Sequence, residues 1–194
     1  MRTRNLALIM SVALLASGIA QTGRSDAGTG SHVGAQAAAD LMRESAKSQA
    51  AFLTAGNLNA AFDEKNLASL MQFPTEQVVV VDVLGSDVRA ALERSIALYP
   101  QPNRSFLQIS GFTVEFNPSG TPNNRIRSVS IENGAMDEGK TYSIAMPLSL
   151  ARGGMGYFKQ WDKQKIVRTL PGTIEDILRD KRAASSPSRW VSRP

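Results

Sequence analysis

The stretch VVVVDVLGSDVRAALERSI, residues 78–96, decides the fold class. Residues 77–84 form a nearly continuous β-branched run, which is typical of a strand buried on both faces. Gly85 breaks this run, and Ser86 is a residue type that caps helices. Apolar residues then recur at helical spacing, at Val88, Ala91, Leu92, Ile96 and Tyr99. A buried strand followed at once by an amphipathic helix predicts a protein of mixed α/β type.

On the amino-terminal side, helical spacing of apolar residues predicts a helix over residues 33–47. A short apolar run at residues 50–54 predicts a buried strand. Asp63 is a capping residue type, so a second helix is expected from there to residue 71. Helices and strands therefore alternate in this part of the chain.

On the carboxyl-terminal side, β-structure dominates. Strands are expected at residues 106–109, 112–116, 126–131, 142–146 and 166–170, with turns at 117–120 and 133–134. Thr173 and Asp176 have the spacing of a capping box, which predicts a final helix to about residue 182. Early alternation followed by hairpins indicates an α/β fold with α+β character, in which helices pack on a mixed β-sheet.

The first 20 residues have the pattern of a secretory signal peptide. Arg2 and Arg4 precede an apolar run at residues 6–15, and small residues at 18–20 predict cleavage before Gln21. The alternative is a membrane anchor, but the run is shorter than the ~20 residues that a spanning helix needs. We therefore expect a periplasmic or secreted protein without a membrane span after cleavage. Residues 21–32 are expected to be a linker, 33–182 the domain, and 183–194 a basic tail.

Charge and composition narrow the possible functions. The formal net charge is +5, and it falls to +3 when the two arginines of the signal segment are removed. An exported protein seldom meets nucleic acid, so no nucleic-acid partner is expected. The sequence has no cysteine and one histidine, His32. No catalytic residue, metal site or cofactor is therefore expected in these residues.

The loop GGMGY, residues 153–157, has the form of a ligand loop but lacks a polar residue. Three glycines in four positions free the backbone for a tight turn. Met155 stands where a functional loop would carry a polar side chain. The sequence therefore raises the question of whether this loop has lost its ligand.

The order of motifs resembles a known family. After the strand and helix of residues 78–96 come FLQISGFTVEFNP, RIRSVSIENGAMDEGKTYSIA and LARGGMGY. This series is similar to the C-terminal domain of the 5′-nucleotidase family, which reads close to FLQVSG, KTY and GGDGY in the same order. The resemblance extends from about residue 35 to 170 and implies the fold of that domain.

The resemblance also implies that catalysis and nucleoside binding lie in different domains. Enzymes of this family are exported, and an N-terminal metallophosphatase domain holds two metals while the C-terminal domain binds the nucleoside. The present sequence resembles the second part, and a two-metal site needs several His, Asp and Asn ligands. The resemblance therefore implies a recognition module without catalytic machinery of its own.

The family's nucleoside contacts can be carried over position by position. Of its two stacking phenylalanines, Phe73 retains one, and Ser149 occupies the position of the other. Packing of Phe73 into the core beside Pro74 is the alternative. Met155 stands in place of the Asp that hydrogen-bonds the nucleoside. The family's NGGGIR segment matches TAGNLN, which places Thr54 and Asn59 at its Asn and Arg. The loop scaffold is retained as Gly153, Gly154, Gly156 and Tyr157.

Three functions remain open at this stage. The first is an exported, non-catalytic binding or interaction module with a degenerate nucleoside pocket, in which nucleoside binding is weak or absent. The second is the substrate-recognition subunit of a nucleotide hydrolase that acts in nucleotide catabolism with a separate metallophosphatase chain. The third is a structural envelope protein. The expected partner is accordingly a metallophosphatase chain or another envelope protein.

Overall fold

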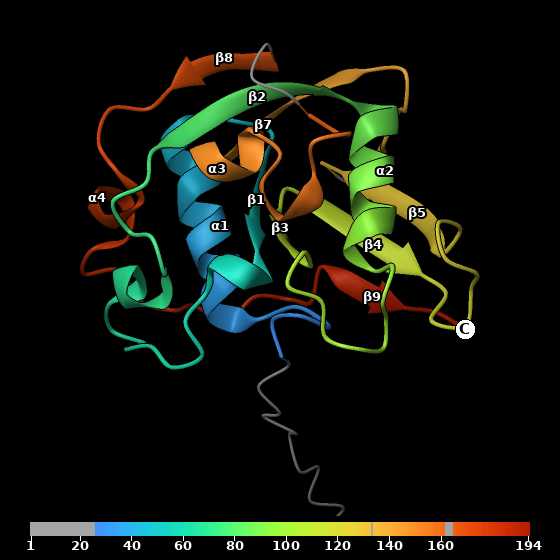
Figure 1. Ribbon diagram of the computed structural model, residues 1–194, viewed down its shortest axis with the longest axis horizontal. Coiled ribbons are helices and arrows are strands. Elements are labelled where there is room, and N and C mark those ends of the chain that lie inside the picture. Colours follow the sequence, from blue (N-terminus) through green and yellow to red (C-terminus); the bar gives the residue numbers. More distant parts are fainter. Residues whose placement is uncertain (1–25, 133, 162–164) are drawn as a thin grey trace, which may run out of the picture.

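The computed structural model describes residues 26–132, 134–161 and 165–194. The expected signal peptide, the first part of the expected linker and Asn133 of the expected turn lie outside these ranges. The chain forms two β-sheets with helices packed on them (Figure 1), which confirms the predicted α/β class with a mixed sheet. The helices are α1 (Val33–Ala46), α2 (Gly85–Ser95), α3 (Leu148–Ala151) and α4 (Ile174–Leu178). No helix in the described ranges has the length and apolar character needed to cross a bilayer.

The larger sheet has five strands in the order β3 (Leu107–Ser110), β1 (Ala50–Thr54), β7 (Thr141–Pro147), β2 (Val78–Leu84) and β8 (Ile166–Thr169). β1 pairs parallel with β7, and the other neighbours are antiparallel. Along β2, Val79 and Val81 belong to one apolar core and Val78 and Val80 to the other. The prediction of a strand buried on both faces is therefore confirmed for the first four residues of β2.

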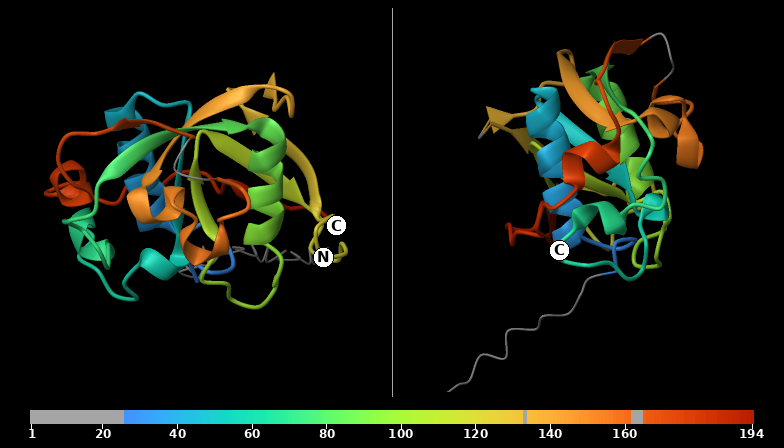
Figure 2. Two further views of the ribbon diagram at one scale, coloured as in Figure 1. Left: turned by 45° about the horizontal axis from the view of Figure 1, so that its top comes forward. Right: turned by 90° about the vertical axis from the view of Figure 1, so that its left-hand side faces the viewer.

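The two faces of this sheet are covered by different elements. One core joins α1 and α4 to the sheet, and the other joins α2, α3 and the second sheet to it. Figure 2 shows α1 and α3 on opposite sides of the strands. α1 and α2, the two helices predicted from apolar spacing, thus pack in different cores on the two faces of the sheet.

The smaller sheet has the order β6 (Gly134–Ala135), β5 (Ile126–Ile131), β4 (Phe112–Phe116) and β9 (Trp190–Ser192). Phe112, Val114 and Phe116 are buried, which confirms the period of two predicted for β4. β4 pairs antiparallel with β5 and parallel with β9.

The end of the chain is part of the domain, and the prediction of a tail over residues 183–194 is wrong. Figure 1 shows β9 beside β4, and the Trp190 side chain is 6% exposed. The indole Nε1 donates to the Leu107 carbonyl oxygen (2.8 Å). Arg189 Nη2 lies 2.7 Å from both carboxylate oxygens of Asp40. Arg189, one of the basic residues that suggested a solvated tail, therefore binds the chain end to α1.

The expected linker is also packed against the domain, as far as it is described. Gly28 is buried, and Gln108 Nε2 donates to the carbonyl oxygens of Ala27 and Gly30 (2.8 and 2.7 Å). His32 caps α1, because its Nδ1 accepts the backbone N–H of Ala35 (3.2 Å). The small polar composition of this segment reflects turns and a helix cap.

Three helices differ in detail from the prediction. The helix expected at residues 63–71 is a 3₁₀ helix, Leu67–Leu70, which Asn66 caps. α2 begins at Gly85 without a side-chain cap, so Ser86 does not have the predicted role. The capping box of Thr173 and Asp176 is confirmed, but α4 ends at Leu178, earlier than expected.

Candidate functional site

Three chain segments meet at one edge of the five-stranded sheet. β1 and β7 are parallel neighbours, so both strands end at this edge. β2 is antiparallel to β7 and therefore begins there, with Val78 opposite Pro147. The carboxyl ends of parallel strands are a usual place for ligand sites in open α/β sheets. The topology thus brings the segments after Thr54, before β2 and after β7 together.

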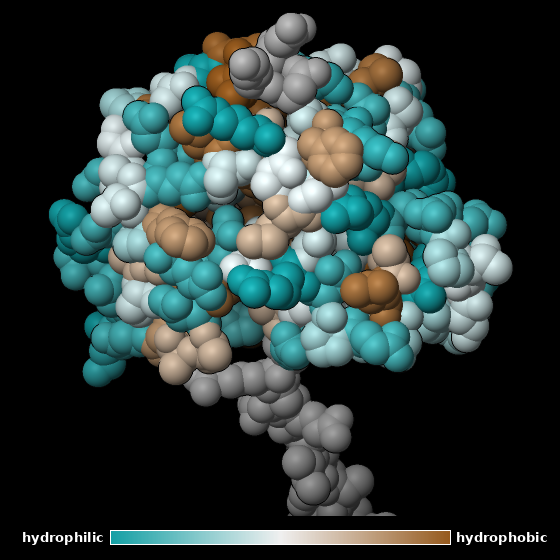
Figure 3. Space-filling model, in the orientation of Figure 1, coloured by the Kyte–Doolittle hydropathy of each residue, from teal (hydrophilic) through white to brown (hydrophobic). Residues whose placement is uncertain are grey.

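These segments enclose a cavity of about 440 Å³, which we call the Phe73 cavity. The face that carries α3 is hollowed near its centre, with apolar residues among hydrophilic ones (Figure 3). Five of the residues predicted from the family resemblance line the cavity: Thr54, Phe73, Ser149, Gly154 and Met155. Its remaining lining residues are Asn57, Thr75, Glu76 and Leu150.

Phe73 lies on the rim of this cavity and not in the core. Its side chain is 57% exposed, so the alternative of core packing beside Pro74 is wrong. Backbone hydrogen bonds hold the segment, because the carbonyl oxygens of Phe73 and Pro74 accept the N–H groups of Glu76 (3.2 Å) and Glu175 (2.7 Å). The segment is thus fixed by its backbone, and its exposed Phe73 ring is available for stacking on a ligand.

The backbone of the Gly153–Tyr157 loop explains its glycines. Gly153 and Gly156 have φ angles of 88° and 81°, in the left-handed region. A Cβ atom at Gly153 would lie 2.6 Å from Cα of Phe158, and one at Gly156 would lie 2.1 Å from Nη2 of Arg94. Met155 also has a positive φ, 54°, which is uncommon for a bulky side chain. The loop conformation is therefore imposed by its surroundings.

Arg94 and Ser105 hold the loop through one atom. The Met155 carbonyl oxygen accepts Nη2 of Arg94 and Oγ of Ser105, both at 2.9 Å. The Arg94 guanidinium also lies over the Tyr157 ring, 5.3 Å from its centroid. The scaffold of the predicted ligand loop is thus intact.

Tyr157 anchors the end of the loop in the core. Its ring stacks on Trp161 at a centroid distance of 5.1 Å, and its hydroxyl donates to the Ser105 carbonyl oxygen (2.6 Å). Burial raises the pKa of Tyr157 well above its ordinary value, and the nearby Arg94 opposes this only in part. The phenol is therefore neutral in the folded protein.

Tyr157→Phe should lower the free energy of unfolding by about 0.5–1.5 kcal/mol at pH 7, because one hydrogen bond is lost. The raised folded pKa means that this tyrosine contributes stability fully below the unfolded pKa of about 10 and loses it as pH rises further. The variant lacks that loss. Urea unfolding at pH 7 and pH 10.5 should show the difference between the two proteins narrowing, and a difference that stays constant would contradict the assignment.

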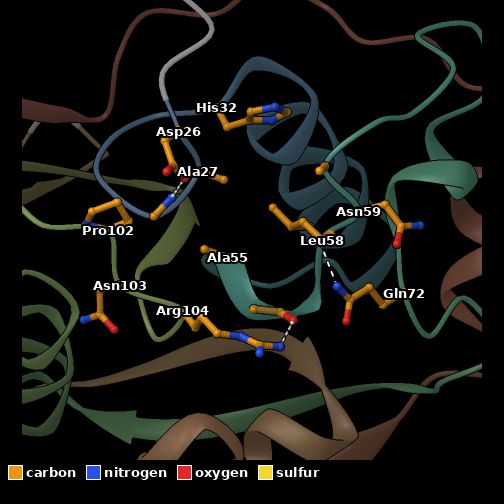
Figure 4. Close-up of a pocket in the computed structure, with 13 residues that line it drawn as sticks. Asp26, Ala27, His32, Ala55, Leu58, Asn59, Gln72, Pro102, Asn103 and Arg104 are labelled. Carbon is orange, nitrogen blue, oxygen red and sulfur yellow. Dashed lines mark hydrogen bonds between the residues drawn. The ribbon is translucent and has the colours of Figure 1, made fainter.

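Of the five predicted ligand contacts, Asn59 is the one that does not line the Phe73 cavity. Its Nδ2 donates to the carbonyl oxygens of Ser69 (2.9 Å) and Met71 (3.3 Å). It lines a separate cavity of about 600 Å³ between the loops around His32, Asn59 and Arg104 (Figure 4). Met155 lies close to Gly56, which lines the larger cavity, since a Cβ atom at Gly56 would be 2.9 Å from the Met155 sulfur. The amide of Asn59 therefore stabilises the backbone of residues 69–71 through its two hydrogen bonds.

Three polar residues of the Phe73 cavity were not predicted from the sequence: Asn57, Thr75 and Glu76. Asn57 is 5% exposed and follows β1, where a polar residue just beyond a buried strand was the available signal. Glu76 accepts the backbone N–H of Ser149 through Oε1. Nothing in the sequence links Asn57 to Thr75 and Glu76, which are brought together by the pairing of both β1 and β2 with β7. In the described ranges, no three His, Cys, Asp or Glu residues are grouped so that they could hold a metal ion.

Comparison with known proteins places the chain among nucleotidase domains. The family model described as "5′-nucleotidase, C-terminal domain" matches residues 12–161. The chain is 33% identical over 135 residues to a 5′-nucleotidase-related protein of Glossina morsitans morsitans, which covers 60% of this chain and 24% of that protein. It is 29% identical over 134 residues to a human 5′-nucleotidase, covering 60% of this chain and 22% of the relative. The chain thus spans about a quarter of the length of these relatives.

Solved structures agree on the fold. A 5′-nucleotidase precursor from Thermus thermophilus matches with a TM-score of 0.70 and 21% identity, over 87% of this chain and 37% of that one. A 5′-nucleotidase from Staphylococcus aureus, solved with alpha-ketoglutarate, matches with a TM-score of 0.67 and 16% identity, over 86% and 37%. The architecture described above is therefore that of a domain within longer proteins.

Proposed function

This chain belongs to the 5′-nucleotidase C-terminal domain family, and on that premise we propose that it is an exported, non-catalytic binding or interaction module with a degenerate nucleoside pocket. The observation that carries the proposal is the Phe73 cavity, which has the place and scaffold of a ligand site. Two of its residues, Ser149 and Met155, differ from the Phe and Asp that the family resemblance implies for a nucleoside. Asn59, matched to the family's Arg, lines another cavity.

The missing contacts are large enough to matter. One stacking ring contributes ~1–3 kcal/mol, and a hydrogen bond to a charged group contributes ~1.5–3 kcal/mol. Loss of one ring and two charged contacts therefore weakens nucleoside binding by roughly three decades or more. A module of this kind retains the fold while nucleoside affinity becomes weak or absent.

The same composition argues against hydrolysis by these residues. A two-metal phosphohydrolase needs several His, Asp and Asn ligands, and the sequence has one histidine, whose Nδ1 caps α1. We expect the purified chain to release no phosphate from AMP or a generic phosphate ester with Mn²⁺, Co²⁺ or Zn²⁺ added. Turnover that follows the protein through a final sizing column, above a mock preparation, would overturn the proposal. So would micromolar binding of adenosine by the wild-type chain.

Export is supported by the charged and apolar pattern of residues 2–20 and by the word "precursor" in the name of the Thermus relative. N-terminal sequencing of the native protein tests it, because an uncleaved chain begins at Met1. A start near Gln21 is the expected result.

A second candidate is a substrate-recognition subunit that acts with a separate metallophosphatase chain in nucleotide catabolism. The observation that favours it is the length of the relatives, since this chain matches about a quarter of each. Co-purification from the envelope fraction distinguishes the two candidates. A co-purifying metallophosphatase would favour the subunit, and another envelope protein would favour the interaction module.

A further inference from the structure

The Phe73 cavity has a negative charge that no ion pair balances among the described residues. Among the described residues that line it, Glu76 has the one formal charge. No ion pair involving Glu76 is found within the described ranges. A carboxylate on the wall of a concave site focuses its field there and attracts cations.

Two arginines of neighbouring segments are bonded to other partners. Arg94 binds the Met155 carbonyl oxygen and the Tyr157 ring, and it does not line the cavity. Arg104 lines the larger cavity and reaches the Gly56 carbonyl oxygen (3.4 Å). The backbone N–H of Ser149 is already bonded to Glu76. A phosphate or carboxylate in the Phe73 cavity would therefore face Glu76 with no Lys or Arg among the residues that line the cavity.

The walls of the cavity suit an aromatic ring. Phe73 presents an exposed ring, and Leu150 and the thioether of Met155 supply further apolar surface. A ring face attracts cations, and a thioether makes favourable contacts with aromatic groups. These three side chains form an apolar surface on which the body of a ring-shaped ligand can pack.

Two neutral polar groups lie deeper. Thr54 is fully buried, and its Oγ1 has no hydrogen-bond partner among the described residues. Asn57 also lines the cavity and is 5% exposed. A hydroxyl and a carboxamide can both accept N–H donors, so they suit a ligand with nitrogen-bound hydrogens.

We propose that the Phe73 cavity selects a cationic aromatic ligand, a ring that bears a protonated amine, over neutral or anionic rings. The inference rests on the proposed function, because it names the ligand class that replaces the nucleoside. In the complex the ring lies against Phe73, Leu150 and Met155, and the ammonium group faces Glu76. Ring N–H groups donate to Thr54 or Asn57.

A charge series on one ring tests this. Tryptamine, tryptophol and indole-3-acetate carry charges of +1, 0 and −1 at pH 7 on the same indole. Calorimetry should show tryptamine binding about tenfold more tightly than tryptophol, and indole-3-acetate more weakly still, because each step changes one charge near a partly buried carboxylate. Glu76→Gln should bring the three dissociation constants within about threefold, because the variant lacks the negative charge that distinguishes the ligands. Gln is chosen because it retains an oxygen that accepts the Ser149 N–H.

The matched control is Glu175→Gln, which removes the same charge from a residue outside the cavity that pairs with Arg179. It should leave the order and the ratios unchanged. Phe73→Ala should weaken all three ligands alike. Equal binding of the series, tightest binding of indole-3-acetate, a preference that survives Glu76→Gln, or no binding of any of the three would overturn the inference. None of these results depends on the phosphatase and adenosine measurements that test the proposed function.

Discussion

The double variant Ser149→Phe, Met155→Asp is expected to bind adenosine at millimolar concentration or better, whereas the wild type should show no binding. The two changes restore one stacking ring and one charged acceptor, which together contribute roughly 2–6 kcal/mol. Glu76 lines the same cavity, so the introduced carboxylate meets a like charge and the gain should fall in the lower part of that range.

Exposure at Ser149 and the backbone conformation at Met155 suit the two changes. Ser149 is exposed, and it lines the same cavity as Phe73. Met155 has φ 54° and ψ 22°, a left-handed conformation that Asp adopts more readily than Met. Gly153 and Gly156, which flank it, already accommodate the turn.

Calorimetry with adenosine measures the gain, and circular dichroism checks that the variant is folded. Adding Phe73→Ala to the double variant should abolish binding, because the stacking slot then lacks its first ring. A folded double variant that gains nothing would show that Ser149 and Met155 do not occupy the family's stacking and acceptor positions.

Trp190→Ala should lower the free energy of unfolding by about 3–5 kcal/mol, the range for truncating a buried Trp. The indole packs against Phe106 and Phe116 at centroid distances of 5.0 and 6.1 Å, and its N–H bonds to Leu107. For a domain of this size the melting temperature should fall by roughly 10 °C or more.

Val191→Ala is the matched control, since it alters the next residue of β9, which is only partly buried. It should cost less than about 1.5 kcal/mol. Urea unfolding of the three proteins measures both effects. If residues 183–194 were a solvated tail, both substitutions would be neutral, so equal stability of all three proteins would contradict the placement of β9.

β9 and the loop after β7 are each held in the fold by contacts with distant residues. β9 closes the smaller sheet beside β4, and Arg189 ties it to α1. The loop after β7 is held by Arg94, which bonds to the backbone carbonyl of Met155, and by Tyr157, which bonds to Ser105. Neither contact uses a side chain that lines the Phe73 cavity. Pocket residues can therefore change while the scaffold persists, which is how one fold can carry different ligand sites.

The sequence by itself determined those features that rest on neighbouring residues. The β-branched run of β2 specified a strand buried on both faces, and the Thr173–Asp176 spacing specified a helix start. The glycines at 153 and 156 indicated a tight loop because their backbone conformation is rarely open to other residues. Similarity of motif order further predicted that Thr54, Phe73, Ser149 and Met155 share a site, and the structure places all four around one cavity.

Tertiary structure alone decided what depends on residues far apart in the chain. Trp190 and Arg189 look like part of a polar, basic tail until β4 and Asp40 are placed beside them. Glu76 becomes a cavity residue because β2 is antiparallel to β7, which brings its carboxylate to the N–H of Ser149, 73 positions away. Asn59 does not line the Phe73 cavity, because its amide is hydrogen-bonded to the carbonyl oxygens of Ser69 and Met71. Strand pairing and hydrogen-bond competition have no local signature, so no pattern of neighbouring residues could predict these three outcomes.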